Sequence, residues 1–149
     1  MRKMEKIKIK VKSLSGRTPV YQTDGSSGAD LIAYLPDGPI TMNPGDIRLV
    51  PTGMVIELPE GIEAQIRARS GLSLKHGITM INGVGTVDSD YRGEWNVPLV
   101  NLGKEPYVIN DGERIAQAIF ARYEKADFVL SEEINETERG GGGFGHTGK

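Results

Sequence analysis

The clearest pattern in the chain is a strict alternation of apolar residues and lysines near the N-terminus. Ile7, Ile9 and Val11 occupy every second position, and lysines stand between them. A period of two places alternate side chains on opposite faces of an extended strand. The pattern therefore predicts a first strand with one buried face and one exposed face.

Further short segments of strand-like composition follow, and turn residues separate them. Turn signals occur at 36–38, 43–45, 59–61 and 110–112, where glycine follows proline, asparagine or acidic residues. The predicted strands cover 31–34, 46–50, 54–58, 63–68, 96–101, 107–109 and 116–122. Many short strands at this spacing favour an all-β sandwich or barrel.

One helix and one mobile segment complete the predicted organisation. The helix covers 70–77, where Ser70 can cap the first turn and Gly77 can end the last. A helix of about two turns is too short to be stable alone, so packing must hold it. The glycine-rich end of the chain cannot build a core. We therefore expect one β domain over 1–138 and a mobile tail over 139–149.

Composition narrows the classes of function. The net charge of −2 provides no strong field for nucleic acid or an anionic membrane, so neither is an expected partner. The absence of cysteine excludes disulfides, thiolate catalysis and cysteine metal sites. No apolar run follows the N-terminus, so we expect no signal peptide or membrane span and a cytoplasmic location.

The segment 68–72 is a candidate phosphate site. If Ser70 caps the helix, free amide N–H groups at the helix end attract phosphate, and Arg69 adds a cation with a donor fork. An ordinary helix cap beside a surface arginine is the alternative interpretation.

The segment 82–94 is predicted to form a hairpin that carries acids. Asp88 and Asp90 lie two positions apart, so on an extended strand they share a face, whereas Tyr91 points the other way. One acid could activate water and the other could stabilise the structure. A solvated hairpin tip with turn-forming acids is the alternative.

Three other features are weaker by themselves. Asp30 lies just before a predicted strand, and Gln117 lies in a predicted strand. The segment 143–149 matches the start of a P-loop, but it lacks the strand, hydroxyl residue and helix that this motif needs. His76 and His146 show no metal-ligand spacing.

Taken in order, five segments resemble the five motifs of the trimeric dUTPase family. They are 27–31, 68–72, 82–94, 112–117 and 139–148, and together they span nearly the whole chain. Two departures are visible. Ala68 stands where a proline is common, and His146 stands where a serine is common. Neither change removes a chemical role.

The resemblance implies a fold, an assembly and a reaction. The fold would be an all-β distorted jelly roll of the β-clip type with one short helix. Three chains would form a homotrimer with active sites between subunits, and the tail of one chain would close a site built by others. The enzyme would hydrolyse dUTP to dUMP and pyrophosphate by water attack on the α-phosphorus. This reaction lowers dUTP and supplies dUMP for thymidylate synthesis.

The resemblance also implies the role of each site residue. Asp88 would be the catalytic base, and Asp30 would reach a Mg²⁺ cofactor through water. The residues implied in substrate binding are Arg69, Ser70, Gly71, Asn82, Gly83, Val87, Tyr91, Gln117, Arg139, Phe144, Gly145 and Thr147.

Two other functions remain open. A dCTP deaminase has a similar fold and trimer but acts on the base, and that family usually carries extra N-terminal sequence and lacks this tail. A non-enzymatic regulatory protein on the same scaffold is the other alternative, because fold alone does not fix function.

Overall fold

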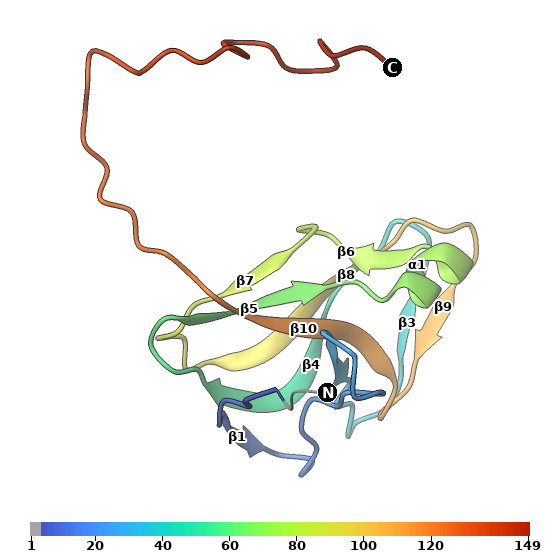
Figure 1. The fold of residues 1–149 in the computed structure, drawn as a ribbon. Helices are drawn as coiled ribbons and strands as arrows, with labels where there is room; N and C mark the ends of the chain where they lie inside the picture. The colour runs from blue at the N-terminus through green and yellow to red at the C-terminus, as the bar shows by residue number, and fades with distance from the viewer. Residues whose placement is uncertain (1–3) are drawn as a thin grey trace.

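The computed structural model describes residues 4–149, which form ten short strands and one short helix (Figure 1). In chain order these are β1 (Lys10–Ser13), β2 (Ala29–Ile32), β3 (Ile40–Met42), β4 (Ile47–Glu57), β5 (Ile62–Arg67), α1 (Ser70–His76), β6 (Ile78–Met80), β7 (Gly85–Val87), β8 (Glu94–Asn101), β9 (Tyr107–Ile109) and β10 (Arg114–Arg122). The predicted all-β class with one helix is confirmed.

The strands form two four-stranded antiparallel sheets and one small pair. One sheet has the order β1-β4-β8-β6, the other has the order β2-β10-β5-β7, and β3 pairs with β9. Apolar side chains from both large sheets meet in one core, where Leu31, Ile56 and Leu99 have no exposed surface. This core joins two open sheets, as expected for a distorted jelly roll.

Two predicted strands are in fact one. The segments 46–50 and 54–58 belong to the single strand β4, whose pairing with β8 shifts register between Pro51 and Val55. Gly53 lies within this shift with φ +70, and the Tyr34 ring occupies the place where a Cβ would stand. The bend therefore requires a glycine, and the strand continues through residues that resemble a turn.

The first strand begins later than the alternation predicts. β1 starts at Lys10, which pairs with Glu57 at the very end of β4. Residues 4–9 have no pairing partner on β4, and Ile7 is 47% exposed. Ile9 and Val11 are half-buried as expected. The prediction was wrong for Ile7 because the length of β4 limits this strand.

The helix has the predicted position but not the predicted cap. Arg69 is the N-cap residue, and no side chain caps the helix, so Ser70 is the first helical residue instead. Gly77 ends the helix in the left-handed conformation, as predicted. A Cβ at this position would collide with the backbone of Gly103. The three-residue strands β3 and β6 were not predicted.

The C-terminal segment leaves the body after β10. The last strand ends at Arg122, and the chain then runs in extended form away from both sheets (Figure 1). Large apolar side chains in this arm are exposed, including Phe128 and Leu130. The boundary at residue 139 stays a prediction.

Candidate active site

A polar pocket of about 320 Å³ lies where β2, β10 and the start of α1 meet. Five residues implied by the resemblance lie in this pocket, although they come from three distant segments of the chain. These five are Asp30, Arg69, Ser70, Gly71 and Gln117. Gln22, Ser26, Ser27, Gly28 and Arg114 complete the lining.

Asp30 is the central charge of the pocket. It lies inside β2 rather than just before a strand, and only 7% of the residue is exposed. Its carboxylate is 3.6 Å from Nε of Arg69 and 3.4 Å from Nη1 of Arg114, and it accepts a 3.0 Å hydrogen bond from Gln22 Nε2. Two guanidinium groups thus face one carboxylate, which leaves an excess of positive charge around the pocket.

Gln117 is fixed by the strands around it. It is paired in register with Asp30 on β2 and with Arg67 on β5. Its Nε2 donates a 3.0 Å hydrogen bond to the Ala68 carbonyl, and its side chain packs directly against the Cα of Gly28. A side chain at position 28 would displace the amide, so glycine is required for this close approach.

Arg114 was missed by the sequence reasoning, although it lies in the 112–117 segment. Three positions separate it from Gln117, so in a regular strand the two side chains would point to opposite faces. A register shift between Arg114 and Ala116 restores a common face. Such a bulge depends on the pairing with β2 and leaves no mark in the sequence. Gln22 was also missed, because only the bridge between Val20 and Asp30 brings it to the pocket.

The segment 82–94 links the two sheets and is not a hairpin. Its strand β7 pairs with β5, whereas β8 pairs with β4 and β6. Asn82 and Gly83 form a turn in which Gly83 has φ +73 and donates to the Met80 carbonyl. The predicted hairpin is therefore wrong, because the two flanking strands belong to different sheets.

Asp88 and Tyr91 lie in a second turn of the same segment. The Tyr91 amide donates a 3.2 Å hydrogen bond to the Asp88 carbonyl, so 88–91 is not an extended strand. The predicted common face of Asp88 and Asp90 is wrong for this reason. Tyr91 is 45% exposed, and its hydroxyl donates to the Glu94 carbonyl at 2.9 Å.

Asp88 lies far from the pocket within one chain. Val87 pairs with Ala64, which places Asp88 beside Glu63 at the start of β5. Arg69 follows the other end of that strand, six residues later. At about 3.3 Å per residue, the two side chains are separated by about 20 Å of strand. The fold therefore does not bring Asp88 and Arg69 of the same chain together.

The tail residues also lie outside the pocket. The Arg139 guanidinium donates to the Gly142 carbonyl at 2.8 Å, so it is held by the tail itself. Phe144, Gly145 and Thr147 are exposed. Figure 1 shows the tail apart from both sheets.

Two features are absent from residues 4–149. No group of three histidine or carboxylate side chains within this part of the chain could hold a metal ion. No helix in it is long and apolar enough to cross a membrane.

The all-β fold carries a pocket in which two guanidinium groups surround one carboxylate, a charge distribution that suits an anionic, phosphate-like ligand. The dUTPase family model matches residues 15–148. The chain belongs to the dUTPase family.

Curated and solved proteins agree with this assignment. The chain is 55% identical to the deoxyuridine 5'-triphosphate nucleotidohydrolase of Finegoldia magna, over 96% of this chain and 99% of that protein. A structure of the Staphylococcus bacteriophage 80alpha dUTPase with dUPNHPP has a TM-score of 0.86 at 23% identity, and covers 95% of this chain and 99% of that one. The dUTPase of S. aureus phage phi11, described with a structural Mg(II) ion, has a TM-score of 0.76 at 19% identity, over 85% and 98% of the two chains. At these identities the two structures show the fold alone.

Proposed function

We propose that this protein is a dUTP diphosphatase, which hydrolyses dUTP to dUMP and pyrophosphate by attack of water on the α-phosphorus. The observation that carries the proposal is the match to the Finegoldia nucleotidohydrolase, at 55% identity over nearly the full length of both chains. The cationic pocket supplies the electrostatic complement for a triphosphate in a chain whose net charge is −2.

The pocket binds the phosphates. Arg69 and Arg114 supply the positive charge, and Asp30 holds both guanidinium groups in place. A guanidinium can hold two phosphate oxygens at once, which fixes orientation as well as charge. Gln117, Ser70 and Gly71 line the same cavity and offer further donors to phosphate oxygens.

The pocket fits a Mg²⁺ ion that is held mainly by the substrate. Asp30 is the one carboxylate among the described residues that line it, and Arg69, Arg114 and Gln22 already contact its oxygens. Contact through water fits this arrangement, and so does the tendency of Mg²⁺ to retain several waters. When bound, the ion would neutralise charge on the phosphates and help to orient them.

The segment 82–94 recognises the nucleoside and carries the base. Asn82, Gly83 and Val87 contact uracil, whose N3–H donor and O4 acceptor are reversed in cytosine. Tyr91 packs under the deoxyribose and excludes a 2′-hydroxyl. Asp88, which is an exposed residue of this segment, orients the water and takes its proton.

A complete site requires more than one chain. Asp88 and Arg69 of one chain are about 20 Å of strand apart, so a single chain cannot place both at one α-phosphorus. We propose that the protein is a homotrimer in which one subunit supplies the 82–94 segment and another supplies the pocket. Arg139, Phe144, Gly145 and Thr147 of a tail then close over the phosphates and the base.

An apolar face supports assembly. Leu49 on β4 is paired with Pro98 on β8, which places both on the outer face of their sheet, away from the core. Three apolar side chains at this face are exposed: Ile47 at 59%, Leu49 at 61% and Ile81 at 48%. The Ile81 amide donates a hydrogen bond to the Pro98 carbonyl, which places Ile81 beside this pair of strands. Contiguous exposed apolar groups of this kind mark interaction surfaces.

We expect Leu49→Glu to convert trimers to smaller species in analytical ultracentrifugation, whereas Lys75→Glu on α1 serves as a control for added charge. Trimers of unchanged stability in Leu49→Glu would exclude this face as the interface.

One assay tests the activity. Release of pyrophosphate is measured with dUTP, dCTP, dTTP and UTP, each with and without Mg²⁺. We expect the protein to hydrolyse dUTP but not the other three nucleotides, and we expect Mg²⁺ to increase the rate. Release of ammonia from dCTP would instead identify a deaminase, and no turnover of any nucleotide would favour a binding protein. We place the reaction in the cytoplasm, without a nucleic-acid or membrane partner.

A further inference from the structure

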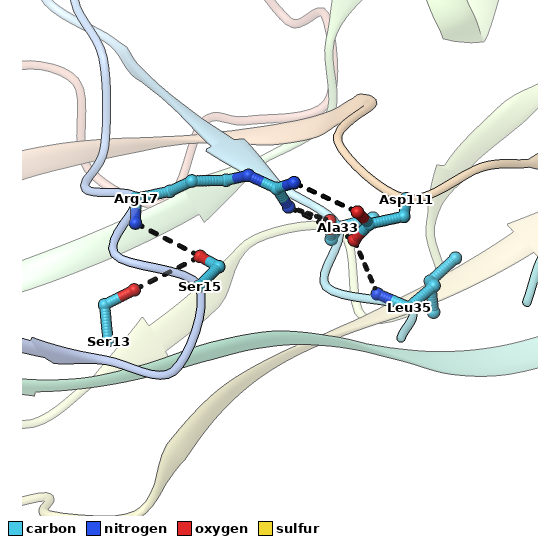
Figure 2. A network of polar contacts seen from close by, with 6 residues as sticks. All are labelled: Ser13, Ser15, Arg17, Ala33, Leu35 and Asp111. Atoms are coloured by element: carbon cyan, nitrogen blue, oxygen red, sulfur yellow. Dashed lines mark hydrogen bonds and ion pairs between the residues drawn. The ribbon is translucent and has the colours of Figure 1, made fainter. Parts of the chain in front are cut away.

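An ion pair joins three segments of the chain (Figure 2). Its two residues do not line the phosphate pocket, although each of the three segments contributes a residue to that lining. Arg17 donates from Nη1 and Nη2 to the two carboxylate oxygens of Asp111, at 3.1 and 3.0 Å. Nη1 also donates to the Ala33 carbonyl at 3.1 Å. Asp111 accepts a further hydrogen bond from the Leu35 amide at 2.9 Å. Together, Arg17 and Asp111 link the N-terminal segment, the end of β2 and the turn before β10.

The same three segments carry the residues that surround Asp30. Five residues after Arg17, the N-terminal segment reaches Gln22 through the bridge between Val20 and Asp30, and Gln22 bonds to the Asp30 carboxylate. On the other side of β2, the Asp111 turn leads directly into β10, where Arg114 contacts the same carboxylate.

The backbone at Ala33 connects the ion pair to the bulge in β10. The Ala33 amide donates to the Glu113 carbonyl at 2.8 Å, and the Ala33 carbonyl accepts from the Gly112 amide at 2.9 Å. That carbonyl is also an acceptor for Arg17. The register shift that turns Arg114 toward the pocket follows immediately after these bonds. We therefore expect a change in this corner to alter the start of the bulge.

We propose that Arg17 and Asp111 are positioning residues for the phosphate pocket, which hold β2 and β10 in the alignment that lets Arg114 face Asp30. The proposal rests on the proposed function only in assigning phosphates to this pocket. Neither residue touches the substrate. Their effect is exerted through the backbone of Ala33 and the turn before β10.

The geometry distinguishes this pair from an ordinary surface ion pair. A bidentate contact with two additional backbone bonds fixes both side chains, although they are 35% and 43% exposed. The hydrogen bonds from Arg17 and from the Leu35 amide lower the pKa of Asp111 to about 2. Exposed pairs add little to global stability, so we expect the main effect in the pocket.

The test compares two ligands that occupy different parts of the site. Inorganic pyrophosphate probes the pocket, and deoxyuridine, which has no phosphate, probes the 82–94 segment. For Arg17→Ala and Asp111→Asn, we expect competitive inhibition by pyrophosphate to weaken about 10-fold, as for other residues that orient binding groups. Inhibition by deoxyuridine should not change. Arg17→Lys keeps the positive charge but cannot form the bidentate contact with Asp111. Its inhibition constant for pyrophosphate should therefore lie between those of wild type and Arg17→Ala.

The control is Lys10→Ala, which removes the exposed ion pair with Glu57 on β4 and should change neither constant. Equal weakening of both ligands, or weakening of neither, would overturn the proposal. If Arg17→Ala does not fold, Arg17→Lys provides the same comparison. Calorimetric titration of pyrophosphate separates this proposal from the proposed function. A wild-type protein that binds pyrophosphate but does not hydrolyse dUTP would refute only the latter.

Discussion

The separation of Asp88 from the pocket leads to a quantitative prediction about mixed trimers. Asp88→Asn removes the proposed base, and Arg69→Ala removes one guanidinium that contacts Asp30. Each homotrimer should be inactive, because every site lacks one part. If the two proteins are unfolded together in equal amounts and refolded, chains assort at random and some sites should become complete.

The recovered fraction follows from the arrangement of the site. Since about 20 Å of β5 separates Asp88 and Arg69, one site takes these residues from two different chains. The chain that supplies Asp88 must then be the Arg69→Ala type, and the chain that supplies Arg69 must be the Asp88→Asn type. Each condition holds for half of the chains, so about one quarter of the sites recover in a closed symmetric trimer.

The assay is pyrophosphate release per site, with mixed trimers verified by native mass spectrometry. Wild type mixed with the double variant Asp88→Asn/Arg69→Ala is the matched control. If each site is shared between two chains, both must be wild type, so about one quarter of the sites are active in this mixture. If each site lies within one chain, about one half of the sites are active. Activity of the two single variants that stays at the unmixed level, in verified mixed trimers, would refute the shared site.

Three further predictions concern single residues. Asp88→Asn should lower kcat about 10²–10⁴-fold while binding of a non-hydrolysable dUTP analogue is retained; turnover within a few-fold of wild type would exclude Asp88 as the base. Tyr91→Ala should relax rejection of UTP more than rejection of dCTP, and equal changes in the two kcat/KM ratios would contradict its role at the sugar. The pKa of Asp111 is lowered to about 2, so its contribution to stability is complete above about pH 4 and is lost as the pH falls through about 2. The pair is exposed, so we expect only a small difference in Tm between wild type and Asp111→Asn at neutral pH. This difference, followed by the fluorescence of Trp95, should disappear over this pH range, and a constant difference would show that the carboxylate charge is not its cause.

The local sequence pattern was sufficient to predict strands that have one more buried and one more exposed face. The alternation of buried and half-buried residues along β5 follows the sequence period, and its predicted and observed bounds differ by one residue at each end. β9 was predicted at its observed bounds. β9 contains only three residues, and it was predicted because the Asn110-Asp-Gly112 turn signal follows it directly. β3 and β6 also contain three residues each, too few to show a period, and they were not predicted. Their existence depends on the partner strands β9 and β8.

The site was predictable only in part, for a related reason. The residue types at Asp30, Arg69 and Gln117 could be identified from the ordered motifs, and the structure brings all three to one pocket. Arg114 could not be identified from strand periodicity, because only a bulge formed with β2 turns it to the same face as Gln117. Features that depend on pairing with a distant strand are absent from any local pattern.

The contacts of Asp30 give a physical reason to divide the site between chains. A guanidinium that pairs with a carboxylate stabilises its charged form and makes it a weaker base, so Asp88 is a better base when it does not pair with the phosphate-binding arginines. Asp30 already contacts both Arg69 and Arg114. About 20 Å of strand keeps Asp88 of the same chain away from them. In the proposed trimer, the Asp88 of another chain meets a pocket whose arginines are paired with Asp30 and with substrate phosphates, so Asp88 remains available to the attacking water.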